Sequence, residues 1–240
     1  MIEWREEGVL LSARPHGEAH SIAEALTVGH GRVAGLVHGG QSRKKAAMMQ
    51  PGTQLDLSFR ARSEDALGTL SAEPMRSRAH LMGERRPLAA LNAATALLRF
   101  ALPEGEAHPR LYRATMRLLD GLGDAGWELG YLEWEVLLLE EAGFALDLSR
   151  CAVTGATDGL AFVSPKTGRA VTEAGAGGYA GRLLPLPPVL RGGDGGPAEV
   201  AEGLRVTGHF LARSLGAALG RQLPEARARL LDALERDGRP

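Results

Sequence analysis

The apolar residues of this chain change their spacing once, after Pro74, and the change divides the sequence into two kinds of structure. Before it, short apolar runs are separated by turns; the runs span 9–14, 22–28, 32–40, 53–62 and 68–75. In the fourth run Leu55, Leu57 and Phe59 alternate with polar residues, which is the period of a strand. Five short strands this close together favour a small barrel, typically an OB-fold, over an immunoglobulin-like sandwich, which needs about seven strands.

After Pro74, leucines recur at helical spacing in 88–102, 111–122 and 127–141, and again in 198–219 and 225–235. Gly143 follows the third of these segments, at a position where helices commonly end. Successive amphipathic helices with short connections indicate a helical domain. We therefore expect an α+β protein with an OB-fold barrel over residues 1–80 and a mainly helical domain over residues 81–240.

The composition limits where such a protein works. Lys and Arg number 28 against 29 Asp and Glu, so nucleic-acid binding would need a local basic patch. The single cysteine excludes an internal disulfide and fits a reducing cytoplasm. The first residues, MIEWREEG, lack the basic start and apolar run of a signal peptide, and no apolar stretch reaches the ~18 residues of a membrane span. We expect a cytoplasmic protein without a membrane segment.

A local basic patch is present within the predicted barrel. Between residues 32 and 62 the only acid is Asp56, whereas the cations are Arg32, Arg43, Lys44, Lys45, Arg60 and Arg62. The segment GGQSRKKAAM is the densest part, and we interpret it as a flexible basic loop that follows a phosphate backbone. A solvated turn is the alternative. Trp4 and Phe59 are the only aromatic residues available for stacking, so binding should be salt-dependent and nearly independent of base sequence.

The sequence offers no complete catalytic or metal site. The His16/His20 pair has zinc-ligand spacing, but Pro15 and Gly17 argue against the helix that this spacing requires. The segment beginning at His38, HGG, resembles part of a lipase oxyanion loop, but no G-x-S-x-G nucleophile motif accompanies it. The glycine-rich run RGGDGGP lacks the lysine of a phosphate-binding loop. We expect a protein that is not an enzyme and that has no cofactor.

A second group of cations lies in the acidic middle of the chain, within residues 104–150. Arg110, Arg113 and Arg117 have helical spacing beside leucine and methionine residues. One interpretation is a binding site for an acidic, hydrophobic peptide tail. The other is an ordinary solvated helix face.

Several segments together resemble one known family. They are LLLEEAGFALDLSRCAVTG, GLAFVSPKTGRAV and AGRLLPLPPVL, with GGQSRKK near the start and LRVTGHFLARSLGAAL and LPEARARLL near the end. The chain is similar to the RecO family of bacterial DNA-repair and recombination mediators over nearly its whole length. The resemblance implies an N-terminal OB-fold and a helical C-terminal domain. It also implies binding and annealing of single- and double-stranded DNA in the RecF pathway, at the nucleoid, with RecR and the C-terminal tail of single-stranded DNA-binding protein as partners.

The chain departs from this family at one place. Many members carry two Cys-x-x-Cys pairs that bind zinc in a ribbon-like insertion, which corresponds here to about residues 149–180. This chain has Cys151 at the first ligand position but Thr154 at the second, and no cysteine follows Gly168. One thiolate cannot make a closed zinc site. We therefore expect a degenerate, cysteine-poor hairpin without metal, held by Leu160, Phe162 and Val171, in which Cys151 is a small buried residue.

The leading hypothesis is a non-enzymatic mediator that binds and anneals DNA. The alternative is a protein-interaction scaffold with little direct DNA affinity, which the nearly neutral net charge allows. An RNA-binding OB protein would account for the barrel but not for the helices or the ribbon.

Overall fold

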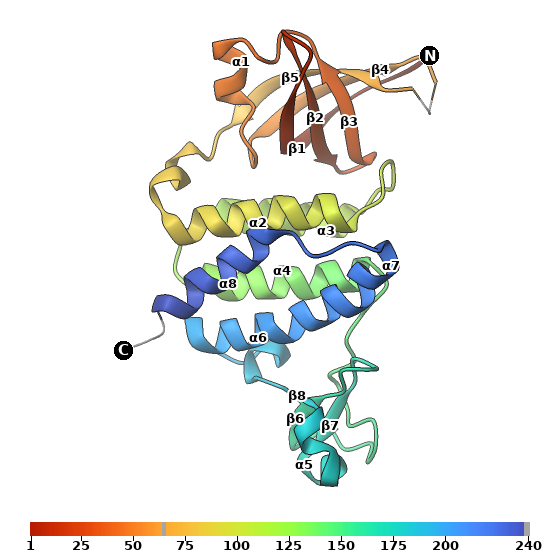
Figure 1. Ribbon diagram of the computed structural model, residues 1–240, viewed down its shortest axis with the longest axis vertical. Helices are drawn as coiled ribbons and strands as arrows, with labels where there is room; N and C mark the ends of the chain where they lie inside the picture. The colour runs from red at the N-terminus through yellow and green to blue at the C-terminus, as the bar shows by residue number, and fades with distance from the viewer. Residues whose placement is uncertain (64–65, 238–240) are drawn as a thin grey trace. The chain divides into compact units, whose positions relative to one another are not determined.

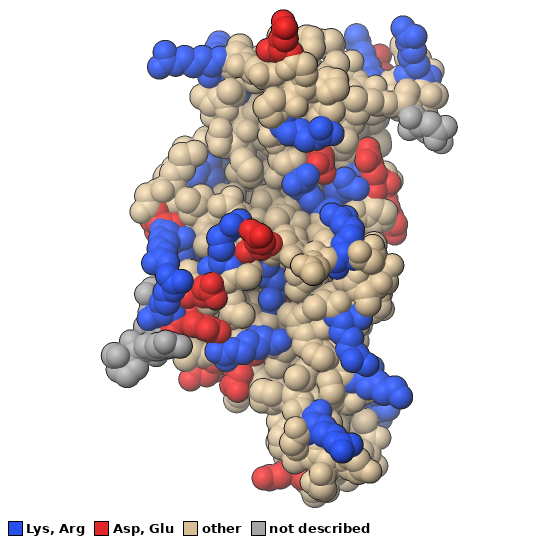
Figure 2. Space-filling model, viewed as in Figure 1, with Lys and Arg blue, Asp and Glu red and all other residues tan. Residues whose placement is uncertain are grey.

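The computed structural model describes residues 1–63 and 66–237. Its chain separates into two compact units, Met1–Gly123 and Asp124–Pro240. The first unit contains five strands and three helices, and the second contains the remaining helices and a small sheet (Figure 1). Basic and acidic side chains both appear on the visible surface (Figure 2).

The strands of the first unit close into a barrel in the order β1-β2-β3-β5-β4. They are β1 (Ile2–His16), β2 (His20–Thr27), β3 (Gly31–Val37), β4 (Gln54–Ala61) and β5 (Gly68–Arg76). All neighbours are antiparallel except β3 and β5, which pair in parallel. The five predicted strands are confirmed, although β1 begins seven residues before the predicted run at 9–14. The first half of β1 is rich in charged residues, so it contains no apolar run from which a strand could be predicted.

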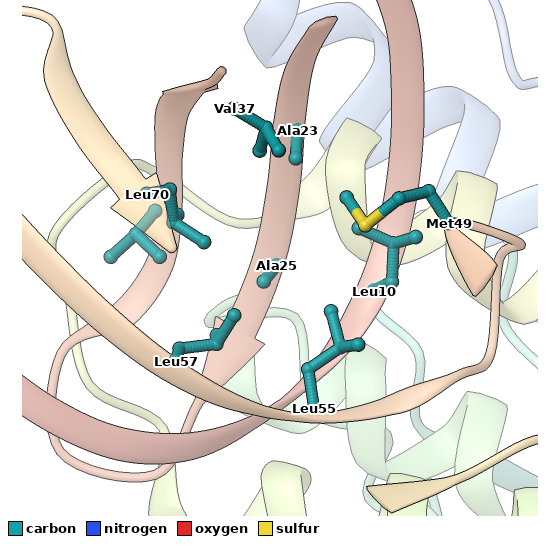
Figure 3. Packing of buried hydrophobic residues seen from close by; sticks show 9 residues of the cluster. Leu10, Ala23, Ala25, Val37, Met49, Leu55, Leu57 and Leu70 are labelled. Carbon is teal, nitrogen blue, oxygen red and sulfur yellow. The ribbon is translucent and has the colours of Figure 1, made fainter. Parts of the chain in front are cut away.

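Alternation along the strands fills the barrel (Figure 3). The inward-facing residues of all five strands, together with Met49, form one apolar cluster; its buried members are Leu10, Ala23, Ala25, Val33, Val37, Met49, Leu55, Leu57 and Leu70. Small residues on β2 and larger ones on β4 share this interior, so the barrel is packed with side chains. Trp4 and Phe59 pack against the same cluster from a partly buried position.

Three helices and a short 3-10 turn complete the first unit: α1 (Arg43–Met48), η1 (Ala79–Gly83), α2 (Arg85–Ala101) and α3 (Pro109–Gly121). The buried guanidinium of Arg78 donates to the carbonyls of Gly52 and Leu119 and pairs with Asp120, so it joins the barrel to α3. Arg99 of α2 pairs with Glu24 of β2 at 2.6 Å. Burial alone would raise the pKa of Glu24, but Arg99 and Arg32 together lower it.

The second unit is mainly helical, as predicted. It contains α4 (Trp127–Glu141), α6 (Pro197–Phe210), a π-helical turn η4 (Leu211–Gly216), α7 (Ala217–Leu219) and α8 (Glu225–Asp237). The carboxylate of Glu135 on α4 is fully buried, and it accepts hydrogen bonds from Arg227 of α8 and Thr207 of α6. This network joins the three long helices.

The ribbon segment is a three-stranded sheet of order β7-β6-β8, where the sequence predicts a two-stranded hairpin. Its elements are β6 (Leu160–Val163), β7 (Ala170–Thr172), α5 (Glu173–Ala176), η2 (Gly177–Arg182), β8 (Leu184–Pro185) and η3 (Pro188–Arg191). The sequence does not predict the third strand, β8, because two residues, one of them a proline, show no period. Val171 is buried with Cys151, and Leu160 and Phe162 pack against them, so the predicted apolar contacts are confirmed.

Candidate nucleic-acid interface

The three consecutive cations of the predicted loop lie on a short helix, α1 (Arg43–Met48). Ser42 caps this helix by accepting a hydrogen bond from the amide of Lys45, so the segment is ordered where a flexible loop was expected. Met49 directly follows α1 and is buried in the barrel core, which fixes the helix end. The side chains of Arg43, Lys44 and Lys45 are all exposed.

The turn between β1 and β2 lies against the segment that leads into α1. The side-chain amide of Gln41 donates to the carbonyls of Gly17 and His20, at 2.8 and 2.9 Å. The amide of Gly39 donates to His20 Nδ1, and the rings of His20 and His38 meet edge to face at 5.0 Å. These contacts bring two distant stretches of sequence to one end of the barrel.

We call this end the tip surface and define it by its basic and histidine residues: Arg14, His16, His20, His38, Arg43, Lys44 and Lys45. Glu18 is the only acid in segments 14–20 and 38–48. Basic side chains project from the surface over α1 in Figure 2. Lys45 donates a hydrogen bond to the carbonyl of His38 at 2.7 Å. This acceptor is neutral, so the bond leaves the positive charge of Lys45 on the tip surface. The tip surface therefore presents clustered positive charge to solvent.

The other three predicted contacts lie elsewhere on the barrel. Arg60 pairs with Glu3 at 2.7 Å. Arg62 is exposed just beyond the same end of β4. The run from Gln54 to Arg60 spans about 20 Å at ~3.3 Å per residue, and α1 and the far end of β4 lie on opposite sides of the barrel (Figure 1). The six cations therefore do not form one patch.

Arg32 is largely buried and holds parts of the first unit together. Its side chain is only 17% exposed; the guanidinium donates to the carbonyl of Leu102 and pairs with Glu24, both at 3.0 Å. These contacts attach β3 to the end of α2. A role for Arg32 in DNA binding stays a prediction.

The two aromatic residues considered for base stacking are already stacked within the barrel. Trp4 lies parallel to His30 at 4.2 Å between ring centroids and to Phe59 at 5.0 Å. Glu6 accepts from the His30 ring at 2.9 Å, which places a carboxylate beside this stack. These rings contribute to barrel packing, and the tip surface contains no Trp, Tyr or Phe.

The second predicted group lies on α3. Arg110, Arg113 and Arg117 are all exposed, and their spacing places them on one face of the helix. This helix belongs to the first compact unit, together with the barrel.

Two family models match this chain, one in each part of the sequence. A family model described as recombination protein O N terminal matches residues 1–78, and one described as recombination protein O C terminal matches residues 83–222. The chain belongs to the RecO family. Relatives named DNA repair protein RecO include those of Roseobacter denitrificans, 58% identical over 98% of this chain and 99% of the relative, and of Cereibacter sphaeroides strain ATCC 17029, 56% identical over 98% and 100%. That of Jannaschia sp. strain CCS1 is 52% identical over 98% and 97%.

In this RecO-family chain, Cys151 occupies the first of the zinc-ligand positions that the family resemblance implies. Its sulfur accepts hydrogen bonds from the amides of Thr154 and Thr172, both at 3.3 Å, and from Val153 at 3.4 Å. Burial alone would raise the pKa of this thiol, but the hydrogen bonds from Thr154 and Thr172 lower its pKa to about 6. In the part of the chain that the structure describes, no three His, Cys, Asp or Glu side chains are grouped as metal ligands.

The residues that sequence reasoning missed in this RecO-family chain are Arg14, His20 and His38 of the tip surface. The contact between His20 and His38 joins two segments about twenty residues apart, and no local sequence period indicates it. The only signal was the HGG run, which has a steric explanation: a Cβ on Gly40 would lie 2.7 Å from Ser21 of β2. No described helix is both long and apolar enough to cross a membrane.

Proposed function

We propose that this chain is a non-enzymatic mediator of DNA repair and recombination, of the RecF-pathway type, that binds single- and double-stranded DNA and anneals strands. In this proposal its barrel is an OB-fold, RecR and the tail of single-stranded DNA-binding protein are its partners, and it works in the cytoplasm at the nucleoid. Membership in the RecO family and the names of the relatives support the repair role.

The tip surface is the observation that carries the DNA-binding part. Cations that neutralise phosphates release condensed counterions, and this release gives affinity without sequence preference. Arg14, Arg43, Lys44 and Lys45 of the tip surface are all exposed, and Glu18 is the single acid of its two segments. We assign the principal phosphate contacts to these residues. Arg62 would be a separate contact at the far end of β4, whereas Arg60 and Arg32 would have to leave carboxylate partners to reach DNA.

Annealing follows from the same charges. Two strands repel each other through their phosphates, and a surface that holds both backbones lowers this repulsion. Base pairing between the strands then supplies the sequence recognition, so the protein does not need to read bases or consume a nucleotide.

Salt dependence tests the assignment. We expect replacement of Arg43, Lys44 and Lys45 by alanine to weaken single-stranded DNA binding and to flatten the log–log salt slope by about 2, because each phosphate contact on a single strand contributes about 0.7. On duplex DNA the change should be about 2.7, at about 0.9 per contact. Fluorescence anisotropy with a labelled oligonucleotide at several salt concentrations measures both slopes.

The matched control is replacement of Arg110, Arg113 and Arg117 by alanine, which removes the same charge from α3 of the same unit. The control should keep the wild-type slope. Equal losses in both variants would mean that only total charge matters, and the tip assignment would be wrong. Wild-type protein that binds no DNA at low salt would favour the alternative scaffold function.

The α3 arginines are the proposed site for the acidic partner tail. A carboxylate-rich peptide with apolar residues would pair with Arg110, Arg113 and Arg117 along one helix face. We expect the α3 variant to lose binding of a peptide with the tail sequence while the α1 variant retains it. The opposite pattern of losses would place the tail on the tip surface.

A further inference from the structure

The ribbon segment carries one aromatic side chain that the proposed function does not use. Tyr179 lies in η2 and is 67% exposed. Ala176, at the end of α5, is buried in the ribbon cluster, and Ala180 of η2 packs against it. The fold of η2 therefore directs Tyr179 to solvent while its neighbours hold the turn in place.

The backbone around this tyrosine is unusually accessible. Gly177, Gly178 and Gly181 surround it, and a Cβ placed on any of them would have no heavy atom within 4 Å. Gly177 also has a positive φ of 46°, which explains a glycine at that position. Packing does not require glycine at Gly178 or Gly181. Together the three glycines leave a strip of backbone without side chains on both sides of the Tyr179 ring. A flat ligand can approach such a strip closely.

A cation accompanies the ring. The guanidinium carbon of Arg182 lies 5.9 Å from the centroid of Tyr179, within the range of a cation–π contact. Basic residues also outnumber acidic ones along the ribbon, and Figure 2 shows the same excess on its visible face. In segment 147–191 the cations are Arg150, Lys166, Arg169, Arg182 and Arg191, and the acids are Asp147, Asp158 and Glu173.

Ion pairing leaves most of these cations available. Arg169 pairs with Asp147 at 3.5 Å, which removes one charge of each sign. Arg191 donates to the carbonyl of Thr157 and keeps its charge. Asp158 and Glu173 are the acids that remain to oppose the other cations, so the ribbon surface has a positive balance.

We propose that Tyr179 and Arg182 form a base-stacking site for single-stranded DNA on the ribbon. The proposal rests on the DNA-binding function proposed above and adds a contact of a different kind. An exposed aromatic ring between bare backbone and a guanidinium is the combination that holds an unpaired base and its phosphate. Paired bases in a duplex present no free face, so this site favours single strands, which the tip surface alone does not.

An acidic peptide is the competing occupant of a ring and a cation. The accessible glycine strip favours the nucleobase, because a peptide of this kind needs an apolar pocket for its side chains. The exposed residues beside Tyr179 in η2 are Gly177, Gly178, Gly181 and Arg182, and none of them offers an apolar side chain. We therefore assign the site to single-stranded DNA.

The experiment compares Tyr179→Ala and Tyr179→Phe in the full chain, with a labelled oligothymidine and an abasic oligonucleotide of the same length as probes. Loss of one base–aromatic stack should weaken oligothymidine binding by roughly 5- to 100-fold, with the salt slope unchanged because no phosphate contact is lost. Tyr179→Phe keeps the ring and should bind oligothymidine as the wild type does. Neither variant should change binding of the abasic probe.

Arg182→Ala provides the second measurement. It should flatten the salt slope on oligothymidine by about 0.7, the contribution of one phosphate contact. If Tyr179→Ala binds oligothymidine as tightly as wild type, the ribbon proposal is wrong, and the tip surface still stands on its own slope. If Tyr179→Ala loses only binding of the acidic tail peptide, the site belongs to a protein. Wild-type protein without DNA affinity would overturn both proposals together.

Discussion

Cys151 has a structural role at the position where the family resemblance implied a zinc ligand. A sulfur that accepts three backbone amides is held as a hydrogen-bond acceptor, and these amides belong to the two segments that the ribbon must keep together. The side chain is 2% exposed. The prediction of a buried residue is confirmed. Its hydrogen bonds were not predictable, because Thr172 is distant in sequence and its contact depends on the ribbon fold.

Stability should depend on pH through this thiol. Its pKa is about 6 in the folded chain and about 9 without the fold, so a depressed pKa adds stability above pH 9 that is lost as the pH falls toward 6. The free energy of unfolding of the wild type, relative to Cys151→Ser, should therefore increase from pH 6 to pH 9. Urea titrations of both proteins at four pH values measure this difference in the free energy of unfolding. Other titrating groups contribute equally to both proteins, so their effects cancel. A flat difference over this window would show that Cys151 stays a neutral thiol.

At the scale of the element, α8 illustrates what a helical period can and cannot report. The sequence predicts an amphipathic helix over 225–235, a segment that contains Arg227 and Arg229. The structure confirms the helix but separates those arginines: Arg229 is exposed, whereas Arg227 is buried against Glu135. Gly208 of α6 makes room for this guanidinium, since a Cβ there would lie 2.6 Å from it. A buried and a solvated arginine two positions apart look alike in sequence, because the difference lies in the helices that face them.

The buried pair provides a stability test. We expect Arg227→Ala to destabilise the protein by about 3–5 kcal/mol, because it leaves the buried Glu135 carboxylate without its cation. Arg229→Ala on the same helix removes only an exposed pair with Glu225 and should change stability by less than about 1 kcal/mol. Urea unfolding of both variants gives the comparison. Similar small effects would mean that water or another group satisfies Glu135 when Arg227 is absent.

At the scale of the whole molecule, the sequence predicted most of the elements and few of their contacts. Strand and helix periods are local. The five strands could therefore be placed from alternations such as that of Leu55 and Leu57, and the long helices from leucines at helical spacing. The tip surface and the attachment of the barrel to α2 and α3 required long-range contacts. The expected boundary near residue 80 stays a prediction: the family matches divide between residues 78 and 83, whereas the compact units divide after Gly123.

Fragments can decide where the first folding unit ends. We expect residues 1–123 to unfold cooperatively, whereas residues 1–80 should fold poorly, because they lack Arg99, which pairs with Glu24, and Leu119, which accepts from Arg78. The loop before α3 also contacts the barrel directly: a Cβ on Gly31 would lie 1.8 Å from the carbonyl oxygen of Glu106. Circular dichroism melts of both fragments measure cooperativity. Equal stability of the two would place the boundary near residue 80.

The closed order of the five strands has a consequence for how this protein can change over evolutionary time. A ring of strands leaves little unpaired backbone edge, here only where β3 and β5 extend beyond their two paired positions, so a partner of the described barrel is recognised mainly through side chains. Surface side chains at turns and on α1 contribute little to the packed interior, which is supplied by other residues. The binding properties of such a domain are therefore open to gradual revision by single substitutions, while the architecture beneath them is inherited intact.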